Sequence, residues 1–583
     1  MTDPLMRYFE QELTFVRRAL GQFGQQHSEH AERLNIHQGQ IEDPSLARLL
    51  DGVSLLNATL EKQLSEQLPE VVQGLLSVIY PSYTQTVPSV AYMHLSAQGD
   101  TPESTVIPKG SHFTSDAKGK TCQFTTVDKL ITTPFQLVDT TASSAPFKFN
   151  RPKGTEQSTA VIQLSLSTGD PSIPFSQLNH RDLDLFVQGF ENNADSIVEL
   201  LLGQTKAISV SDINCDNHVV MRAETLKNRI SDLEFLFLPQ KGNQFSGFQL
   251  INEFFFFKEK RQFFRLKDFA SAAKNFDSCE IKLNLFMHSI PAEFMRLFDN
   301  HVFKLDVIPA INLFEQTGEP TSYDQRCLTI PVNADAHSDS NIDVVEVKDV
   351  FEITPQGEKP LIPLFRDSYR SDPNADYWQS SRDLSGQFKL AISLKPSQEL
   401  EFSKLYGTYL LCTNGKQACG INGVMECSEN IDIPGTFTAI YPPTAPIERE
   451  QNLHLHWQFV GLLNGNFSSL LHAENPTEKL KQMLQLCSRE QILAEEIQMI
   501  HNVSVRSQVS AIRIMGKNVF SPGSEIELTL DTQNSFLAFS DVLNRFFQQF
   551  CSFDRYIQLS IKIYGRDGIA KQYPKIHGSQ LAM

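Results

Sequence analysis

The amino-acid sequence predicts a multi-domain α+β protein with an N-terminal helical segment, a β-rich middle and a mixed α/β C-terminal domain. Apolar residues recur at helical spacing between residues 43 and 80, and short segments rich in Thr, Val and Ile follow from about residue 87. Helical spacing returns near residue 455. Because 583 residues are too many for one hydrophobic core, several domains are expected. The predicted domains are 1–86, 87–245, 246–435 and 436–583.

The N-terminal segment contains a long amphipathic stretch. Asp43 is a suitable N-cap, and Pro44 fits the first helical position, where its missing N–H would have had no partner. Apolar residues then follow on one helical face, at steps of three and four. This N-terminal apolar stripe consists of Leu46, Leu49, Val53, Leu56 and Leu60. Such a stripe suits either a helix that faces the protein's own core or a helix that joins a bundle with other chains.

The middle of the chain is predicted to be mainly strands, with one strand-to-helix segment at 180–204 whose helix begins near Asn193 or Asp195. Its most unusual feature is a run of four phenylalanines. In a strand, alternate side chains of this run would point to opposite faces. We therefore expect burial on both faces within the chain, or contact between one pair of rings and a partner. The candidate residues are Phe254, Phe255, Phe256 and Phe257.

The C-terminal third is predicted to be helical at first and then to close with a β-α-β unit. Helices are expected over 456–473, 477–487 and 489–503. The closing unit comprises a strand at 525–530, a helix at 538–553 and a strand at 556–565. Trp457, in the first of these helices, is a candidate anchor for contact with another protein.

The pattern most similar to a metal site lies between Asp335 and Glu346. Oxygen and nitrogen ligands occupy the EF-hand offsets, but Ser340 stands where the sharp turn requires glycine. The flanking segments are predicted strands, whereas an EF-hand requires helices. We therefore expect a solvated acidic hairpin loop. The residues at the offsets are Asp335, His337, Asp339, Asn341, Asp343 and Glu346.

The nine cysteines are scattered and form no C-x-x-C pair, which is typical of reduced thiols. Cys412, Cys419 and Cys427 lie near His454 and His456 in the sequence, but their spacing is too wide for a zinc knuckle. Neither a P-loop nor a G-x-S-x-G motif occurs. We predict no catalytic centre, no metal and no cofactor.

Charge and hydropathy restrict the classes of partner. The net charge of −17 disfavours binding to nucleic acid, which requires a cationic face. No segment reaches about 18 uncharged apolar residues, so membrane insertion is not expected. The N-terminus is amphipathic and lacks the apolar core of a secretory signal. These observations predict a cytoplasmic protein.

Several segments occur in the order typical of a known family. They are the helix YFEQELTFVRRALGQF at 8–23, the Asp43-Pro44 start, the Tyr80-Pro81 to Pro88-Ser89 exit, the turn at 107–113, the aromatic run at 253–264, and Trp457, Asn466, Phe467, Ser469 and Leu470. Together they resemble the TssF family, also called VasA or ImpG, of the type VI secretion system baseplate. The chain departs from the family pattern at Lys258 and Arg261, where proline and phenylalanine are usual.

This resemblance implies a structural protein similar to the wedge subunits of contractile phage baseplates, and not an enzyme. It implies assembly with TssG-like, TssK-like and TssE-like proteins and with additional copies of the chain, around a VgrG-like spike. The resulting baseplate would dock at the inner membrane of a Gram-negative bacterium, nucleate tube and sheath, and transmit contraction. Two alternatives are a wedge protein of another contractile injection system or phage tail, and a β-rich carbohydrate-binding protein.

Overall fold

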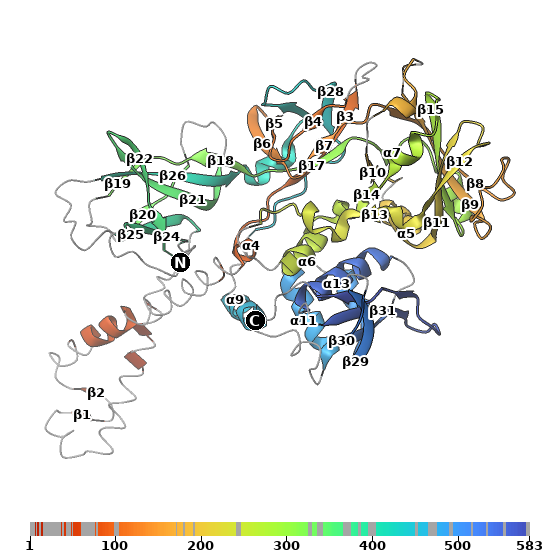
Figure 1. Cartoon of the computed structure of the whole chain (residues 1–583). Coiled ribbons are helices and arrows are strands. Elements are labelled where there is room, and N and C mark those ends of the chain that lie inside the picture. The colour runs from red at the N-terminus through yellow and green to blue at the C-terminus, as the bar shows by residue number, and fades with distance from the viewer. Residues whose placement is uncertain are drawn as a thin grey trace.

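The computed structural model describes most of the chain from residue 80 to residue 578 and parts of the N-terminal segment (Figure 1). Helices and strands are mixed across these residues and strands predominate, as the sequence predicts. The described residues are 6, 9–10, 13–14, 36–37, 40–41, 48, 51–59, 76, 80–97, 104–168, 170, 172–178, 181–189, 193–240, 246–323, 329–334, 342–364, 375–382, 386–393, 404–448, 453–463, 475–488, 494–514, 517–531, 535–551 and 555–578.

A closed six-stranded barrel lies at the centre of the β-rich middle. Its interior is filled by side chains such as Phe113, Phe124 and Phe437, so the barrel is a packed core. Strands from both sides of the predicted border at 245/246 form this barrel, so its segments are far apart in the sequence. In barrel order, the strands are β17 (Val307–Ile311), β3 (Val90–Ala97), β28 (Gly435–Ala439), β27 (Val424–Cys427), β5 (His112–Ala117) and β6 (Lys120–Thr126).

Two further sheets pack beside the barrel around a shared core. The first has the order β12 (His218–Arg222), β11 (Thr205–Asp212), β15 (Glu280–Met287), β9 (Ala160–Ser167) and β8 (Gln136–Ser144). The second has the order β13 (Leu226–Asn228), β14 (Phe263–Leu266), β10 (Leu183–Val187) and β16 (Phe303–Lys304). Helices α5 (Ala194–Gln204), α7 (Phe269–Ala273) and α8 (Ala292–Met295) pack against the same core. The predicted strand and helix at 180–204 are confirmed as β10 and α5, and Asn193 is the N-cap.

Residues 314–413 contain two sheets with a hydrophobic core of their own, which we call the outer β unit. Figure 1 shows this unit standing to the left of the barrel. One sheet has the order β18 (Phe314–Thr317), β26 (Lys404–Thr413), β21 (Asp343–Thr354) and β22 (Gly357–Pro360), and β19 (Thr321–Tyr323) also pairs with β26. The other has the order β20 (Ile330–Pro331), β25 (Phe388–Ser393), β24 (Tyr377–Arg382) and β23 (Ile362–Pro363).

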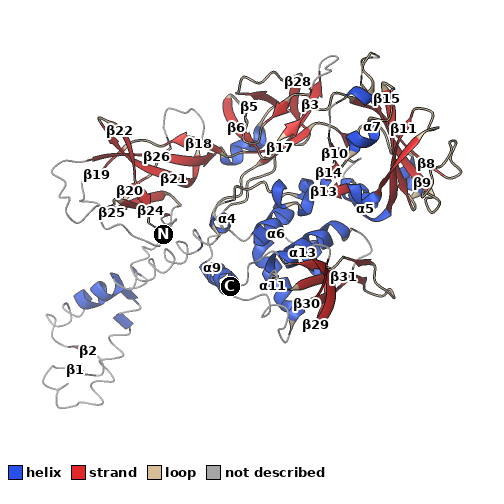
Figure 2. Ribbon diagram, viewed as in Figure 1, coloured by secondary structure: helices blue, strands red, loops and turns tan. Residues whose placement is uncertain are grey.

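The C-terminal unit packs helices against a second large sheet (Figure 2). Strand β30 (Lys517–Leu530) and β31 (Tyr556–Ile563) run parallel and are joined through α13 (Leu537–Phe550), which confirms the predicted β-α-β unit. The helix predicted over 489–503 is wrong in its second half. Among the described residues of this range, α12 (Glu495–Gln498) is helical, and β29 (Ile500–Ile514) then pairs along β30, because ladder hydrogen bonds override helical periodicity there. The unit also contains α11 (Pro476–Ser488), β32 (Lys571–Gln572) and β33 (Ile576–His577).

The phenylalanine run is helical, and the strand predicted for it is wrong. Helix α6 (Ser246–Phe256) contains three of the four rings and packs against α11 and α13. Polar residues Gln249, Asn252 and Glu253 fall three and four positions apart, so they share one face of this otherwise apolar helix. This spacing of polar residues indicates a helix. Most of the rest of α6 is apolar because a helix that is buried on every side has apolar residues almost all round.

Further short elements lie before, between and beside these units. They are β1 (Ile36–His37), β2 (Gln40–Ile41), α4 (Pro81–Thr84), β4 (Val106–Ile107), β7 (Leu130–Ile131) and α9 (Leu453–Leu463). The 3-10 turns are η1 (Phe175–Gln177), η2 (Ala223–Thr225), η3 (Arg229–Ser231), η4 (Leu233–Phe235), η5 (Lys258–Gln262) and η6 (Gly415–Gly420). Among the helices that the structure describes, none has the length and apolar character required to cross a bilayer.

Candidate interaction surfaces

A buried ion pair holds α6 against the segment that precedes it. The Glu253 carboxylate accepts hydrogen bonds from the backbone N–H groups of Phe237 (2.9 Å) and Leu238 (2.9 Å) and from Nζ of Lys260 (2.6 Å). Both charged side chains are fully buried. A buried carboxylate is tolerated when its lone pairs are satisfied by several donors, as they are here. Glu253 therefore fixes the position of α6 relative to residues 237–238.

Aromatic rings surround this ion pair. Nζ of Lys260 lies 5.1 Å from the ring centre of Phe237, and the Arg229 guanidinium lies 3.7 Å from that of Phe235. Arg229 also pairs with Asp128 (2.7 Å). Burial lowers the pKa of Lys260 below its usual value, and Glu253 opposes this shift. Because the Lys260 amine is fully buried, it is not accessible to a substrate, and its role is to stabilise the core.

The four consecutive phenylalanines lie in this core. Phe254 packs between Phe255 (5.3 Å between ring centres) and Phe539 of α13 (5.5 Å), and all four side chains are at most 8% exposed. The expected burial within the chain is therefore confirmed. The proposal that Phe254, Phe255, Phe256 and Phe257 contact a partner needs correction. Their rings are covered by the chain's own helices, so they are absent from its surface.

An aromatic cluster fixes the point at which the N-terminal segment joins the folded body. The rings of Tyr83 and Phe459 are stacked, with centres 4.0 Å apart and planes 4° from parallel. Tyr80 packs against Phe459 (5.6 Å), and its hydroxyl hydrogen-bonds the Asn252 amide (2.9 Å). Residues of α4, α6 and α9 thus meet at one place. A rigid attachment of this kind positions whatever precedes residue 80.

Part of the N-terminal apolar stripe is described, within a helix over residues 51–59. Val53 is 41% exposed and Leu56 is 63% exposed, whereas Ser54 and Ala58 are buried. Positions 54 and 58 lie on the side of the helix away from 53 and 56. Val53 and Leu56, the two described residues of the stripe, therefore face outward on this chain. Leu46, Leu49 and Leu60 lie outside the described residues.

Trp457 is the second exposed candidate. It is 47% exposed on α9, although its neighbours Leu455, His456 and Phe459 are buried. One side of α9 therefore packs on the aromatic cluster while the tryptophan faces outward. The buried side of the helix gives this indole a fixed position.

The structure also tests the predicted metal patterns. Asp335, His337, Asp339 and Asn341 lie outside the described residues, but β20 and β21 flank the loop, as the sequence predicts. Within the described part of the chain, no three His, Cys, Asp or Glu side chains are grouped as metal ligands. The Cys412 thiol is buried, which raises its pKa to about 12.

One pair of side chains that the sequence analysis missed has the composition of a nucleophile and a base. Oγ of Ser209 lies 3.1 Å from Nδ1 of His218, and Nε2 of His218 lies 3.1 Å from the carbonyl oxygen of Asn150. Ser209 is completely buried and also contacts the buried Asn284 amide (3.3 Å). A nucleophile must be accessible to its substrate, so this network stabilises the sheet and does not form an active site.

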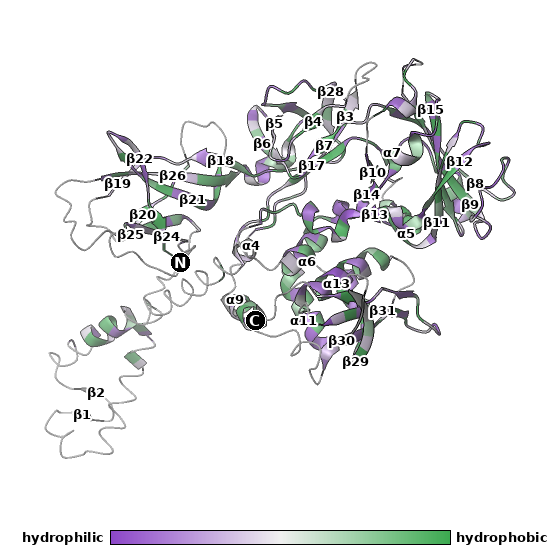
Figure 3. Ribbon diagram, in the orientation of Figure 1, coloured by the Kyte–Doolittle hydropathy of each residue, from purple (hydrophilic) through white to green (hydrophobic). Residues whose placement is uncertain are grey.

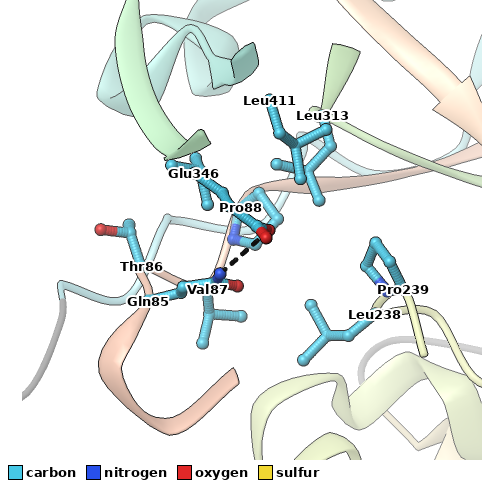
Figure 4. A pocket seen from close by; sticks show the side chains of 10 residues that line it. Gln85, Thr86, Val87, Pro88, Leu238, Pro239, Leu313, Glu346 and Leu411 are labelled. Atoms are coloured by element: carbon cyan, nitrogen blue, oxygen red, sulfur yellow. Dashed lines mark hydrogen bonds between the residues drawn. The ribbon is translucent and has the colours of Figure 1, made fainter. Parts of the chain in front are cut away.

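The best-formed cavities are too small for an ordinary ligand. The first lies where the outer β unit meets the chain leading into the barrel, beside a hydrogen bond from Nε2 of Gln85 to Glu346 (3.2 Å; Figure 4). Its volume is about 10 Å³, which is roughly that of one water. The second, beside Asp306, measures about 180 Å³, whereas ligand pockets typically span about 300–1,000 Å³. Burial raises the pKa of Asp306 to about 7, although Thr133 donates two hydrogen bonds to it.

Comparison with known proteins identifies the family. The family model described as "Type VI secretion system, TssF" matches residues 1–580, almost the whole chain. The chain belongs to the TssF family. It is therefore a baseplate component of a type VI secretion system, which decides against the phage-tail and carbohydrate-binding alternatives. TssF proteins are structural components, in agreement with the absence of a catalytic motif in the sequence.

Individual relatives agree with this assignment. The type VI secretion system component TssF1 of Pseudomonas aeruginosa is 22% identical over 632 aligned positions, which cover 99% of each chain. A chain in the TssK-TssF-TssG baseplate subcomplex of a type VI secretion system has a TM-score of 0.71 at 18% identity, over 92% of this chain and 99% of that chain. A chain in a type VI baseplate complex has a TM-score of 0.56 at 17% identity, over 99% and 100%. The two structures show that this TssF chain shares their fold.

Proposed function

We propose that this TssF chain is a wedge component that uses its N-terminal apolar stripe to join a helical bundle with a TssG-like protein and with further copies of itself. The wedge would engage TssK-like and TssE-like proteins around a VgrG-like spike, in a baseplate docked at the inner membrane. It would there nucleate tube and sheath and transmit contraction. The similarity to a chain of a TssK-TssF-TssG subcomplex supports the first part of this assembly.

The observation that carries the proposal is the outward orientation of Val53 and Leu56, the two described residues of the stripe. Val53 and Leu56 are exposed on a helix whose opposite side, at Ser54 and Ala58, is buried. Leu55, on the flank, is also exposed at 46%. Burying a Val or Leu side chain contributes about 1.5–3 kcal/mol. Covering this face with another helix would therefore be strongly favourable, and leaving it uncovered in water would not.

Trp457 is proposed as a second anchor. Exposed tryptophans are enriched among residues that dominate the binding energy of protein interfaces. The indole projects from α9, which the stack of Tyr83 on Phe459 holds beside the start of the folded body. A partner could cover Trp457 without displacing a core side chain.

Charge substitution in the stripe tests the proposal. The variant Val53→Asp/Leu56→Asp is co-expressed with the TssG-like protein and the complex is purified through a tag on that partner. We expect recovery of this chain to fall at least tenfold, because two carboxylates would have to be buried in the bundle. Thr59→Asp, which adds one charge at an exposed position off the stripe, is the matched control and should co-purify normally.

An unchanged yield for the double variant would refute the role of the stripe in assembly. Equal losses for the double variant and for Thr59→Asp would show that any added charge disturbs this helix. Native mass spectrometry of the recovered complex gives the number of copies of each chain.

A further inference from the structure

The larger sheet of the outer β unit covers the unit's core with one face, and on its other face Leu411, near the end of β26, is buried in a separate core. Along β26, Tyr406, Leu410 and Cys412 point into that core and are buried. Alternate residues point to the opposite side of a strand. Leu405 and Tyr409 therefore lie on the other face, which we call the outer sheet face, and both are exposed.

The centre of the outer sheet face is apolar. Ile353, Leu405 and Tyr409 are 37%, 41% and 38% exposed, and the ring of Phe351 lies 4.9 Å from that of Tyr409. Phe351 lies flat across Gly407, where a Cβ would be only 2.4 Å from the ring. The solvated face of an antiparallel sheet is ordinarily polar. Apolar side chains gathered on such a face are a feature of protein interaction sites.

Carboxylates border this apolar centre. Asp349, Glu358 and Glu315 are exposed on the surrounding strands. Glu358 accepts a hydrogen bond from the Tyr409 hydroxyl (3.0 Å), which raises the pKa of Tyr409, and Lys348 pairs with Glu315. Three acidic groups thus surround the centre, against one lysine. The face combines an apolar middle with a negative rim.

We propose that the outer sheet face binds a protein surface on which Lys or Arg side chains surround an apolar patch. Complementary charge would steer the partner and fix its orientation, while Leu405, Tyr409 and Ile353 would supply the buried apolar area. The negative rim repels nucleic acid, an anionic lipid surface and the same face of a second copy. Charge therefore favours a basic protein over these three alternatives.

This surface is separate from the N-terminal apolar stripe and goes beyond the proposed bundle. Figure 1 shows the strands β21, β22 and β26 well apart from the described helix at 51–59. Figure 3 shows both apolar and polar residues on the strands of the unit. The two surfaces can therefore be tested by different variants of the same chain.

Carboxylate footprinting tests the proposal in the assembled complex. The full-length chain is labelled with a carbodiimide and an amine, alone and in complex with the TssG-like, TssK-like and TssE-like proteins, and modified residues are quantified by mass spectrometry. We expect labelling of Asp349 and Glu358 to fall at least fivefold in the complex, while the exposed Glu224 is unaffected. Equal labelling of Asp349 and Glu358 in both samples would overturn the proposal.

Variants identify the partner and the type of contact. We expect Asp349→Lys/Glu358→Lys to weaken binding to one of the purified proteins at least tenfold, and to reduce the salt dependence of that binding. Leu405→Ser/Tyr409→Ser should weaken the same interaction, whereas Glu224→Lys and Val220→Ser, at exposed positions of another region, should not. Unchanged thermal melting of each variant shows that the fold is intact.

Two other results would contradict the proposal. Equal weakening by the control variants would show that the effect is not specific to this face. A change in self-association without a change in heterologous binding would assign the face to a second copy. If the complex does not form, the proposed bundle is refuted. The role of the outer sheet face is then tested by measuring the binding of each purified protein to the wild-type chain and to the variants.

Discussion

Two apolar segments of this chain differ in their exposure to solvent. The phenylalanines at 254–257 are buried in α6 or directly after it, beneath α11, α13 and residues 237–238. Val53 and Leu56 of the N-terminal apolar stripe are exposed. The more aromatic segment is therefore the one that is unavailable to partners. What distinguishes the two is the presence of other elements around them, and not their own hydrophobicity.

The outer sheet face lies between these extremes. Its apolar residues are only partly exposed, and carboxylates surround them. Charged groups around such a face keep the unbound protein soluble. Four variants test the difference between the buried and exposed segments, and they differ in how strongly they should affect folding.

The largest effect is expected for Glu253→Ala. This change leaves Lys260 without its partner and removes the acceptor of two buried backbone N–H groups. Breaking a buried ion pair costs about 3–5 kcal/mol, so a loss near the upper end is expected in the free energy of unfolding. Chemical denaturation measures it, with Glu234→Ala, at an exposed position, as the control. A loss below about 1 kcal/mol would show that the pair does not hold α6 in place.

Phe254→Ala should come next. Its ring is 1% exposed and contacts Phe255 and Phe539, so the substitution leaves a cavity between α6 and α13. Phe→Ala in a core costs about 3–5 kcal/mol. Differential scanning calorimetry should show a marked fall in melting temperature. If Phe254→Ala melts like the wild type, the ring is not part of the core.

A smaller loss is expected for Tyr83→Leu. The substitution keeps most of the apolar volume but removes the ring stacked on Phe459. Aromatic pairs contribute about 0.5–1.5 kcal/mol beyond their buried area. Hydrogen exchange should become faster in α9, which this stack holds. No change in α9 would indicate that other contacts fix the helix.

The smallest effect on folding is expected for Val53→Ala/Leu56→Ala. Substitutions at exposed positions usually change the free energy of unfolding by less than about 0.5 kcal/mol. Assembly with the TssG-like protein should nevertheless weaken, as measured by titration calorimetry. A large loss of stability without weaker assembly would contradict this prediction. It would place Val53 and Leu56 in the core and the partner contact elsewhere.

Part of the fold could be predicted from local patterns. The β10–α5 segment with its cap at Asn193, and the parallel strands β30 and β31 around α13, follow from alternating and helical periodicity. The run at 254–257 could not be assigned from the four rings alone. Gln249, Asn252 and Glu253, which precede it at helical spacing, contained the signal.

The outer sheet face could not be predicted at all. Leu405 and Tyr409 alternate with buried residues on β26, and periodicity cannot tell which of two apolar faces is covered. Likewise, residues 500–503 fall within the predicted helix, and the long pairing of β29 with β30 decides their conformation. Contacts between segments distant in the sequence determine these features.

Short-range spacing and composition are enough to predict the family, the α+β class, the order of the main segments and the amphipathic N-terminal stripe. Contacts between distant segments place the four phenylalanines in the core, pair Glu253 with Lys260 and leave the outer β unit with an apolar face and an acidic rim. These features follow from the fold because burial depends on which elements meet, as when strands from residues 90–126, 307–311 and 424–439 close one barrel.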